Sequence, residues 1–479
     1  MSLLAVALLF LPGLLVARAP WTHVAPLSLA FWTLAAWWPP FAGPGRGGIV
    51  VSILAAALVL ALLRLAPKHE AAPPPGWAPP PSPTPPARPG RPAPPLVSGP
   101  SFLVLATALG LLAPLPLWHH APGPRLAFQT TTSRLLLWRD GVPVSGEPLL
   151  PLEPVGAHAP ALATLAADVS HVTGLDPGPA QLWIVAVAAG LLLMGLYTLH
   201  AVWAPPLVAA LGALVALAAS PWPGFLSVWG EGEALLALGF LLPAFALLVS
   251  HASRSSAVAA AFMLAAGTLA QPLLATAAVV AASAVALGRY GLGRRAPGRH
   301  GPVRRPPAKR LALSFLLALA LAAPGLAPLA RALSAREALA IATGARAHEL
   351  EAFALGLVLA AMTPLAFVHS ARRRSAAARA GVAGVALVAA LLLVARVHGW
   401  LAAGQLREAT RAALSHAAQV TEPLDSICAA EGVREFVPAL AGRSAGEPGV
   451  WVPPVYADEW AERERRPCRA RLEHLPSRP

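Results

Sequence analysis

The 479-residue sequence is 56% hydrophobic and only 12% charged, whereas about 25% of the residues in a soluble globular protein are charged. The formal net charge of +14 could suggest a nucleic-acid partner, but the Lys and Arg residues gather in short loops between apolar runs, which is a signal of membrane topology. Composition therefore excludes an ordinary soluble domain. We expect a polytopic membrane protein in contact with membrane lipid and no nucleic acid.

Twelve apolar segments follow one another along the chain and predict an all-α fold of about twelve transmembrane helices. A bilayer span needs about 20 largely apolar residues, because every backbone polar group must be bonded inside the helix. Several segments are shorter and contain proline, which favours tilted, kinked or re-entrant helices. The predicted segments are 3–17, 24–41, 48–66, 101–117, 182–203, 205–220, 233–250, 256–271, 273–288, 311–330, 350–369 and 380–397.

Polar stretches divide the chain into four parts. Three membrane helices within residues 1–66 precede a proline-rich connector over residues 67–100. Proline at this density blocks helix and sheet, so we expect a cytoplasmic spacer, with a PxxP ligand as the alternative. A membrane domain over residues 101–397 and a small polar tail over residues 398–479 complete the chain.

Two basic loops predict the orientation in the inner membrane. Residues 289–310 contain eight Lys or Arg and no acid, and residues 371–380 contain four Arg. Such loops stay in the cytoplasm, and counting helices from them places the loop 118–181 and the tail on the extracytoplasmic face. Arg18 follows the first apolar run, which favours an external N-terminus over a signal peptide.

The loop 118–181 contains an amphipathic pattern between Pro160 and Gly174, residues that suit the first turn and the C-terminal cap of a helix. Its apolar positions recur at helical spacing: Leu162, Leu165, Val169 and Val172. The polar residues Thr164, Asp168 and His171 fall largely elsewhere on the helix. We expect a helix along the membrane surface, followed by a membrane helix with Asp176 as N-cap and Pro177 as its first residue.

Four short motifs follow one another through residues 101–290: RDGVP at 139–143, AHAPAL at 157–162, TGLDP at 173–177 and SVWGEGEALLALG at 227–239. Their order resembles the external active-site loop and following helices of the GT-C class of polytopic glycosyltransferases. The resemblance implies transfer of a sugar from a polyprenyl-phosphate donor at the extracytoplasmic face. It also implies a loop carboxylate that activates the acceptor hydroxyl or holds a divalent metal.

The chain departs from this class where the acidic residue is expected. The segment FQTTTSR, residues 128–134, offers hydroxyls but no carboxylate, and the tyrosine of the class's Tyr-Pro-Pro-like segment is replaced around His158. Asp140 or Glu153 is therefore the candidate catalytic carboxylate, although Asp140 also suits a turn and Glu153 a solvated loop. We expect either a divergent enzyme or a relative that has lost catalysis.

The candidates for substrate binding are His119 and His120 at the outer end of a predicted membrane helix, Arg125, Arg134 and His158 in the loop beyond it, and Glu231 and Glu233 at the start of another membrane helix. His119, His120, Arg125 and Arg134 could together hold a lipid phosphate, or anchor the chain at the interface. Glu231 and Glu233 could contribute to a pocket, or favour the positive end of a helix dipole. No His-Glu-x-x-His or Cys-x-x-Cys spacing is present, so we predict no protein metal site from motifs.

The tail contains both cysteines, Cys428 and Cys468. On the extracytoplasmic side they are predicted to form a disulfide, with two free thiols as the alternative.

Besides the glycosyltransferase, the sequence leaves open two other functions: a transporter or flippase, and a non-catalytic envelope assembly protein that works through its tail.

Overall fold

The computed structural model describes the chain in segments that are mostly helical, so the predicted all-α character is confirmed in outline. The described residues are 10–14, 23–37, 99–112, 124–139, 149, 161–202, 204–219, 232–250, 254–272, 274–276, 278–280, 283, 308–332, 384, 387–395, 398, 406–422, 425–430, 433–434, 436–445 and 470–472. Of the predicted membrane segments, 48–66 and 350–369 lie outside these residues, as does the connector 67–98.

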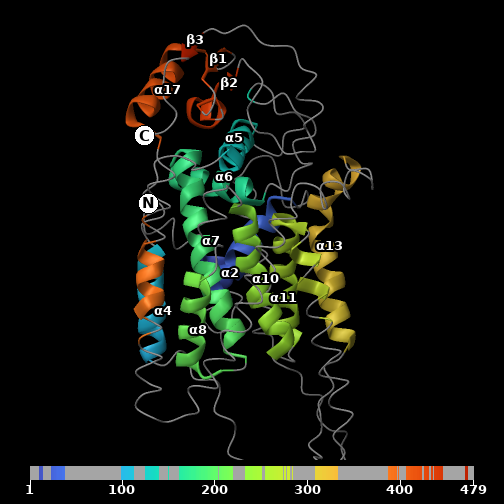
Figure 1. Ribbon diagram of the computed structural model, residues 1–479. Coiled ribbons are helices and arrows are strands. Elements are labelled where there is room, and N and C mark those ends of the chain that lie inside the picture. The colour runs from blue at the N-terminus through green and yellow to red at the C-terminus, as the bar shows by residue number, and fades with distance from the viewer. Residues whose placement is uncertain are drawn as a thin grey trace, which may run out of the picture.

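A bundle of helices makes up most of the structure (Figure 1). Along one row, α8 packs on α7, α7 on α10, α10 on α11, and α11 on α13, while α2 lies against α11 and α4 against α8. The helices span Val24–Ala35 (α2), Gly99–Leu112 (α4), Pro177–His200 (α7), Pro206–Ala219 (α8), Gly232–Ser250 (α10), Arg254–Ala270 (α11) and Ala308–Ala332 (α13). Each coincides with one of the predicted apolar segments.

In the part of the chain that the structure describes, one helix, α7, is long and apolar enough to cross a membrane. Its 24 residues rise by about 36 Å, which exceeds the hydrocarbon thickness of a bilayer. The other bundle helices contain shorter apolar stretches of 10 to 17 residues. The count of twelve spans therefore stays a prediction.

Helices α7 and α10, the central pair, pack closely because glycines on each helix leave space for leucines of the other. A Cβ atom added to Gly195 of α7 would lie 2.9 Å from the Cβ of Leu242, and one added to Gly239 of α10 would lie 2.8 Å from the Cβ of Leu191. Each helix thus places a leucine over a glycine of the other. This reciprocal contact lets the two backbones approach closely, as in membrane helix pairs.

The outer helix α13 has its small side chains inside and its large ones outside. Ser314, Ala318 and Ala322 are buried against the bundle, whereas the leucines that face outward are more than half exposed. These are Leu313, Leu316 and Leu319. Helix α4 also leaves Phe102 and Leu103 more than half exposed. Water-soluble proteins rarely expose apolar rows of this kind.

Two short helices and the C-terminal segment cover one end of the bundle (Figure 1), and we call them together the cap. Helix α5 spans Pro124–Trp138 and α6 spans Ala161–Thr173. The C-terminal segment consists of α17 (Glu408–Val420), β1 (Ser426–Ala429), the π-helix η4 (Val437–Ala441), β2 (Ser444–Ala445) and β3 (Ala470–Leu472). Its sheet has the order β2-β1-β3 with both pairs parallel, and η4 packs on α5. Neither α5 nor the sheet was predicted.

The predicted C-terminal end of α6 is confirmed by its capping. Gly174 has a φ of +70°, a left-handed conformation that glycine adopts without strain, and its N–H donates to the carbonyl of Ser170 at 2.8 Å. Asp176 then caps α7 by accepting from the N–H of Gly178 at 3.2 Å, with Pro177 as the first helical residue.

The environment of α6 differs from the predicted surface helix. Residues 161–170 are all buried, including the polar Thr164 and Asp168. The reason is α5, which packs Leu136 against Ala163 and Ala167 and so covers the side of α6 that the sequence leaves without large apolar residues. The opposite side, with Leu162, Leu165 and Val169, belongs to the main core.

Candidate functional site

Helix α5 buries an unbroken polar run, Gln129 to Ser133, at the end of an apolar bundle. Pro124 opens the helix in a position that tolerates its missing N–H. The hydroxyl oxygens of Thr131 and Thr132 each lie 3.0 Å from the carbonyl oxygen four residues earlier, and that of Ser133 lies 2.9 Å from the equivalent carbonyl. These local bonds satisfy the hydroxyls within the helix, which lets the polar run be buried.

The first residue of this run reaches a carboxylate from a distant part of the sequence. The side-chain Nε2 of Gln129 donates to Oε1 of Glu233 at 2.7 Å, and both side chains are buried. Glu233 lies in the first turn of α10, where a negative charge interacts favourably with the helix dipole. Helix α10 therefore brings a carboxylate to residues 128–134, a segment that has none of its own.

Glycine at the start of α10 makes this approach possible. A Cβ atom added to Gly232 would lie 2.7 Å from Cδ2 of Leu162, 3.0 Å from Cδ2 of Leu126 and 3.4 Å from Cγ2 of Val185. These residues belong to α6, α5 and α7, so the first turn of α10 sits where the three other helices meet. A larger residue at 232 would push Glu233 away from Gln129.

A second polar contact fixes α5 to α7. The hydroxyl of Thr130 lies 2.5 Å from Oε1 of Gln181, and Nε2 of Gln181 donates to the carbonyl of Leu126 at 3.0 Å. Thr130 Oγ1 also lies 3.0 Å from that carbonyl. Because a hydroxyl has one proton, we assign it to the shorter contact with Gln181.

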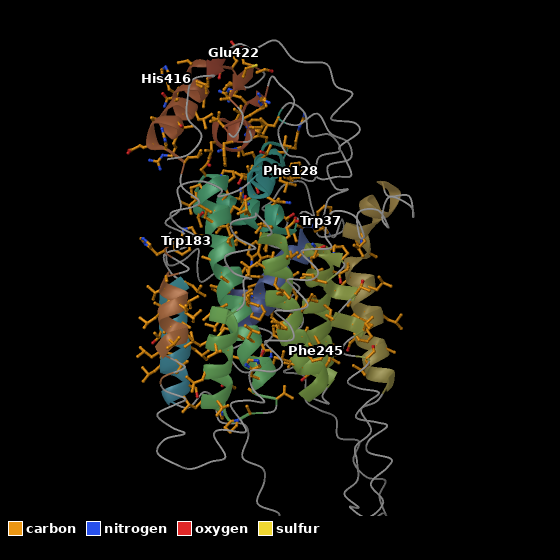
Figure 2. All side chains as sticks on the ribbon, viewed as in Figure 1. Trp37, Phe128, Trp183, Phe245, His416 and Glu422 are labelled. Atoms are coloured by element: carbon orange, nitrogen blue, oxygen red, sulfur yellow. The ribbon has the colours of Figure 1, made fainter. Side chains whose placement is uncertain are left out.

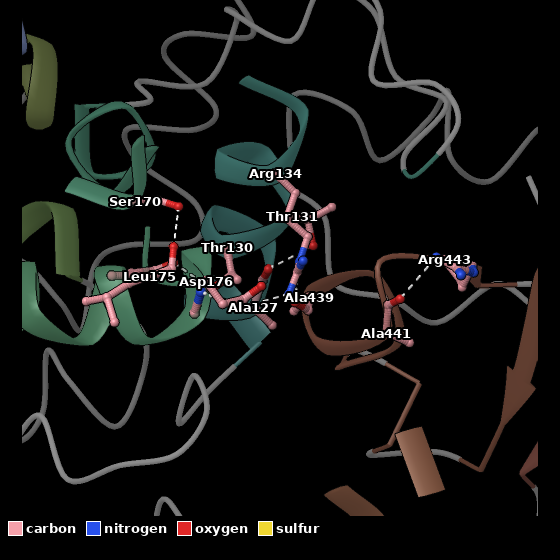
Figure 3. A network of polar contacts seen from close by, with 12 residues as sticks. Ala127, Thr130, Thr131, Arg134, Ser170, Leu175, Asp176, Ala439, Ala441 and Arg443 are labelled. Carbon is pink, nitrogen blue, oxygen red and sulfur yellow. Dashed lines mark hydrogen bonds and ion pairs between the residues drawn. The ribbon is translucent and has the colours of Figure 1, made fainter. Parts of the chain in front are cut away.

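Arg134, a candidate for lipid phosphate binding or for anchoring at the interface, joins three parts of the protein (Figure 3). Its Nη2 forms an ion pair with Oδ2 of Asp176 at 2.8 Å, and its Nε donates to the carbonyl of Ala439 in η4, also at 2.8 Å. The Asp176 side chain is 49% exposed, so the ion pair itself contributes at most about 1 kcal/mol. The contact mainly sets how the C-terminal segment docks on α5.

Arg443 organises the C-terminal segment from within. Its Nη2 donates to the carbonyls of Ala418 and Thr421 at 2.6 Å each, and its Nε donates to Oγ1 of Thr421 at 3.0 Å. It thereby holds the last turn of α17.

Burial lowers the pKa of the Arg443 guanidinium and nearby Asp425 raises it, with a net lowering. The adjacent Gly442, with a φ of +62°, would place a Cβ 3.8 Å from Trp138 at the end of α5.

Of the predicted site residues, the structure places Arg134 and Glu233 at the same end of the bundle but with different partners. Cys428, on β1, is disulfide-bonded, whereas its predicted partner Cys468 lies outside the described residues. So do the remaining predicted residues: His119, His120, Asp140, Glu153, His158 and Glu231. Arg125 falls within α5, but its side chain is not among those described.

Sequence reasoning missed Gln129, Thr130 and Gln181. The available signal was a run of six polar residues, QTTTSR, between two apolar triplets, which a buried helix can contain when the hydroxyls bond to its own backbone. The described residues contain no group of three or more His, Cys, Asp or Glu side chains that could hold a metal ion.

No protein-family model matches the chain, and neither a curated protein nor a solved structure shows significant similarity to it.

Proposed function

We propose that the protein is a divergent glycosyltransferase of the GT-C kind in the inner membrane. It would transfer a sugar from a polyprenyl-phosphate donor to an envelope acceptor at the extracytoplasmic face. In that reaction a carboxylate accepts the proton of the acceptor hydroxyl, and the acceptor oxygen attacks the anomeric carbon. The bond from that carbon to the phosphate oxygen breaks, and polyprenyl phosphate leaves.

The observation that carries the proposal is the 2.7 Å contact between Gln129 and Glu233. The resemblance calls for an acidic residue near residues 128–134, and Glu233 supplies a carboxylate at this segment. The surrounding leucines and valine lower the local polarity, which strengthens electrostatic interactions with a bound substrate. Glu233 thus joins Asp140 and Glu153 as a candidate general base.

The outward leucines of α4 and α13 support the membrane setting of the proposal. Their hydrophobic rows would face acyl chains, and Trp183 of α7, which is 42% exposed, lies near the cap (Figure 2), a suitable level for an interfacial aromatic residue. A lipid-linked donor can be reached only from the bilayer interface. The position of Gln129 and Glu233 where the cap meets the bundle suits that requirement.

Turnover of a polyprenyl-phosphate hexose by purified membranes tests the function. Glu233→Gln should reduce turnover about a hundred- to ten-thousand-fold, because that is the usual effect of losing a general base. The matched control is Glu408→Gln, which neutralises an exposed carboxylate in the first turn of α17 and should leave turnover unchanged. Asp140→Asn and Glu153→Gln belong in the same series, and a loss confined to one of them would reject Glu233 as the base.

A non-catalytic role in envelope assembly is the second candidate. It is favoured by the hydroxyls of α5, which bond to carbonyls of their own helix and so give the polar run a purely structural explanation. Absence of turnover by the unmodified protein across a panel of polyprenyl-phosphate sugars would favour this role over the transferase.

Thiol labelling tests the membrane orientation that both candidates need. His171, at the end of α6, and Ala201, after the last residue of α7, are both exposed and lie at opposite ends of α7. A membrane-impermeant maleimide should label His171→Cys from the periplasm, and Ala201→Cys only after the membrane is opened. The reverse pattern would place the cap in the cytoplasm and remove the basis of the proposal.

A further inference from the structure

The amide of Gln129 has one half engaged and the other half without a partner. Its Nε2 donates to Glu233 at 2.7 Å, whereas its Oε1 is fully buried and accepts no hydrogen bond from the residues that the structure describes. The orientation of the amide is fixed by chemistry, because the opposite orientation would place two oxygen acceptors 2.7 Å apart. The open position is therefore an acceptor next to a carboxylate.

A buried acceptor in this state is unusual, since leaving one unsatisfied costs about 1–3 kcal/mol. The nearest hydroxyls of α5 are already engaged. Thr130 is bonded to Gln181, and Oγ of Ser133 lies 2.9 Å from the carbonyls of both Gln129 and Ala163. None of the described residues supplies a donor to this oxygen, so a bound ligand is the candidate source of one.

We propose that Gln129 Oε1 accepts a hydrogen bond from a sugar hydroxyl of the bound substrate, beside the Glu233 carboxylate. Gln129 then has two tasks, to orient the carboxylate through Nε2 and to bind the sugar through Oε1. The choice of ligand rests on the proposed sugar transfer.

The chemistry at this point selects against the phosphate of a lipid-linked donor. A phosphate offers acceptors, which Oε1 cannot bind, and its charge is repelled by the Glu233 carboxylate. A sugar hydroxyl can donate to Oε1 and remain near the carboxylate. Arg134 lies five residues after Gln129, so it projects from α5 about 140° away, toward Asp176 and η4. The cation and the sugar-binding amide therefore point in different directions.

Equilibrium binding to the full-length protein in lipid nanodiscs tests the proposal without turnover. Three probes are used: a short-chain polyprenyl phosphate hexose, the same polyprenyl phosphate without sugar, and an alkyl hexoside without phosphate. Gln129→Leu removes the Oε1 acceptor, together with the Nε2 donor to Glu233, at similar size. It should weaken binding of a hexose-bearing probe about tenfold, with binding of the sugar-free lipid unchanged. The hexose probe that is affected shows whether the hydroxyl belongs to the donor or to the acceptor.

Thr132→Val is the matched control. It removes a buried hydroxyl of α5 that bonds to Phe128 of the same helix, and it should change the affinity for neither hexose probe. If Gln129→Leu binds both hexose probes as the unmodified protein does, Oε1 is satisfied by a fixed water and the proposal is wrong.

A measurement on the unmodified chain covers the case in which Gln129→Leu fails to fold. Dicyclohexylcarbodiimide modifies carboxyl groups in apolar surroundings, and mass spectrometry of the Glu233 peptide measures the extent of reaction. A hexose-bearing probe should slow modification of Glu233 several-fold, and the sugar-free lipid should not. Equal rates with all three probes contradict the inference. Sugar binding without turnover would reject the transferase function and leave the binding site intact.

Discussion

The bundle and its cap are stabilised by different kinds of interaction. Helices α7 and α10 interlock through glycines and leucines, a steric fit between apolar surfaces. The cap depends on a few directional bonds, among them Arg134 to Ala439 within the cap and Gln129 to Glu233 between the cap and α10. Steric packing is distributed over many atoms, whereas a polar contact depends on one donor and one acceptor. A single substitution in the cap should therefore disturb only the contact that it removes. A single substitution in the bundle should change the stability of the whole bundle.

The largest expected effect on stability concerns the disulfide of the cap. Replacing Cys428 and Cys468 by serine removes a cross-link that closes a loop of about forty residues, and in the chain-entropy model this lowers the free energy of unfolding of the C-terminal segment by roughly 3–4 kcal/mol. Hydrogen exchange, followed by mass spectrometry, should show faster exchange in β1 and α17 but not in α7. Two free thiols in the unmodified, non-reduced protein would contradict the prediction.

The next effect comes from Arg443. Arg443→Ala removes the donors that hold the carbonyls of Ala418 and Thr421, and we expect a loss of about 1.5–3 kcal/mol, the range for hydrogen bonds of a charged donor. Limited proteolysis of the C-terminal segment measures it. Arg443→Lys keeps the charge but not the fork of donors, so a fully protected lysine variant would show that charge alone suffices.

A bundle substitution tests the other half of the comparison. Gly239→Ala places a methyl group 2.8 Å from the Cβ of Leu191, and overpacking of this kind lowers the free energy of unfolding by about 1–3 kcal/mol. Because α7 and α10 must separate, thermal unfolding in micelles should shift for the whole bundle. A shift confined to the cap would contradict the division between the two regions.

The smallest effect should have the opposite sign. Gly110 lies in α4, and a Cβ added there meets no atom within 4 Å. Gly110→Ala should therefore raise the free energy of unfolding by about 0.4–1 kcal/mol, through reduced freedom of the unfolded chain. The same thermal scans measure it. A destabilised Gly110→Ala variant would mean that the effect of Gly239→Ala is not specific to the α7–α10 contact.

The same division explains what the sequence could predict. The apolar runs of the sequence predicted the bundle helices, because hydrophobicity alone defines such helices. These are α2, α4, α7, α8, α10, α11 and α13. Gly174 and Asp176 marked the end of α6 and the start of α7 through local capping rules. These signals depend on neighbouring residues and need no knowledge of the fold.

The cap was predicted less well for physical reasons. Helix α5 contains Thr130 to Ser133, which have low helix propensity and interrupt the apolar pattern. Strands of two to four residues are too short to show a period of two. Glu233 was a candidate because it begins a membrane helix, but its contact with Gln129 spans 104 positions in the sequence and leaves no local trace.

The parallel sheet of the C-terminal segment also affects the order of assembly during biosynthesis. Strand β1 lies between β2 and β3 and pairs with both, and β3 is synthesised about forty residues after β1. The helices of the bundle can pack while the chain is still being synthesised, but β1 lacks one neighbour until that later stretch has been made. The docked cap is therefore among the last structures to form, and a chain halted before β3 would expose an unpaired strand edge to proteases.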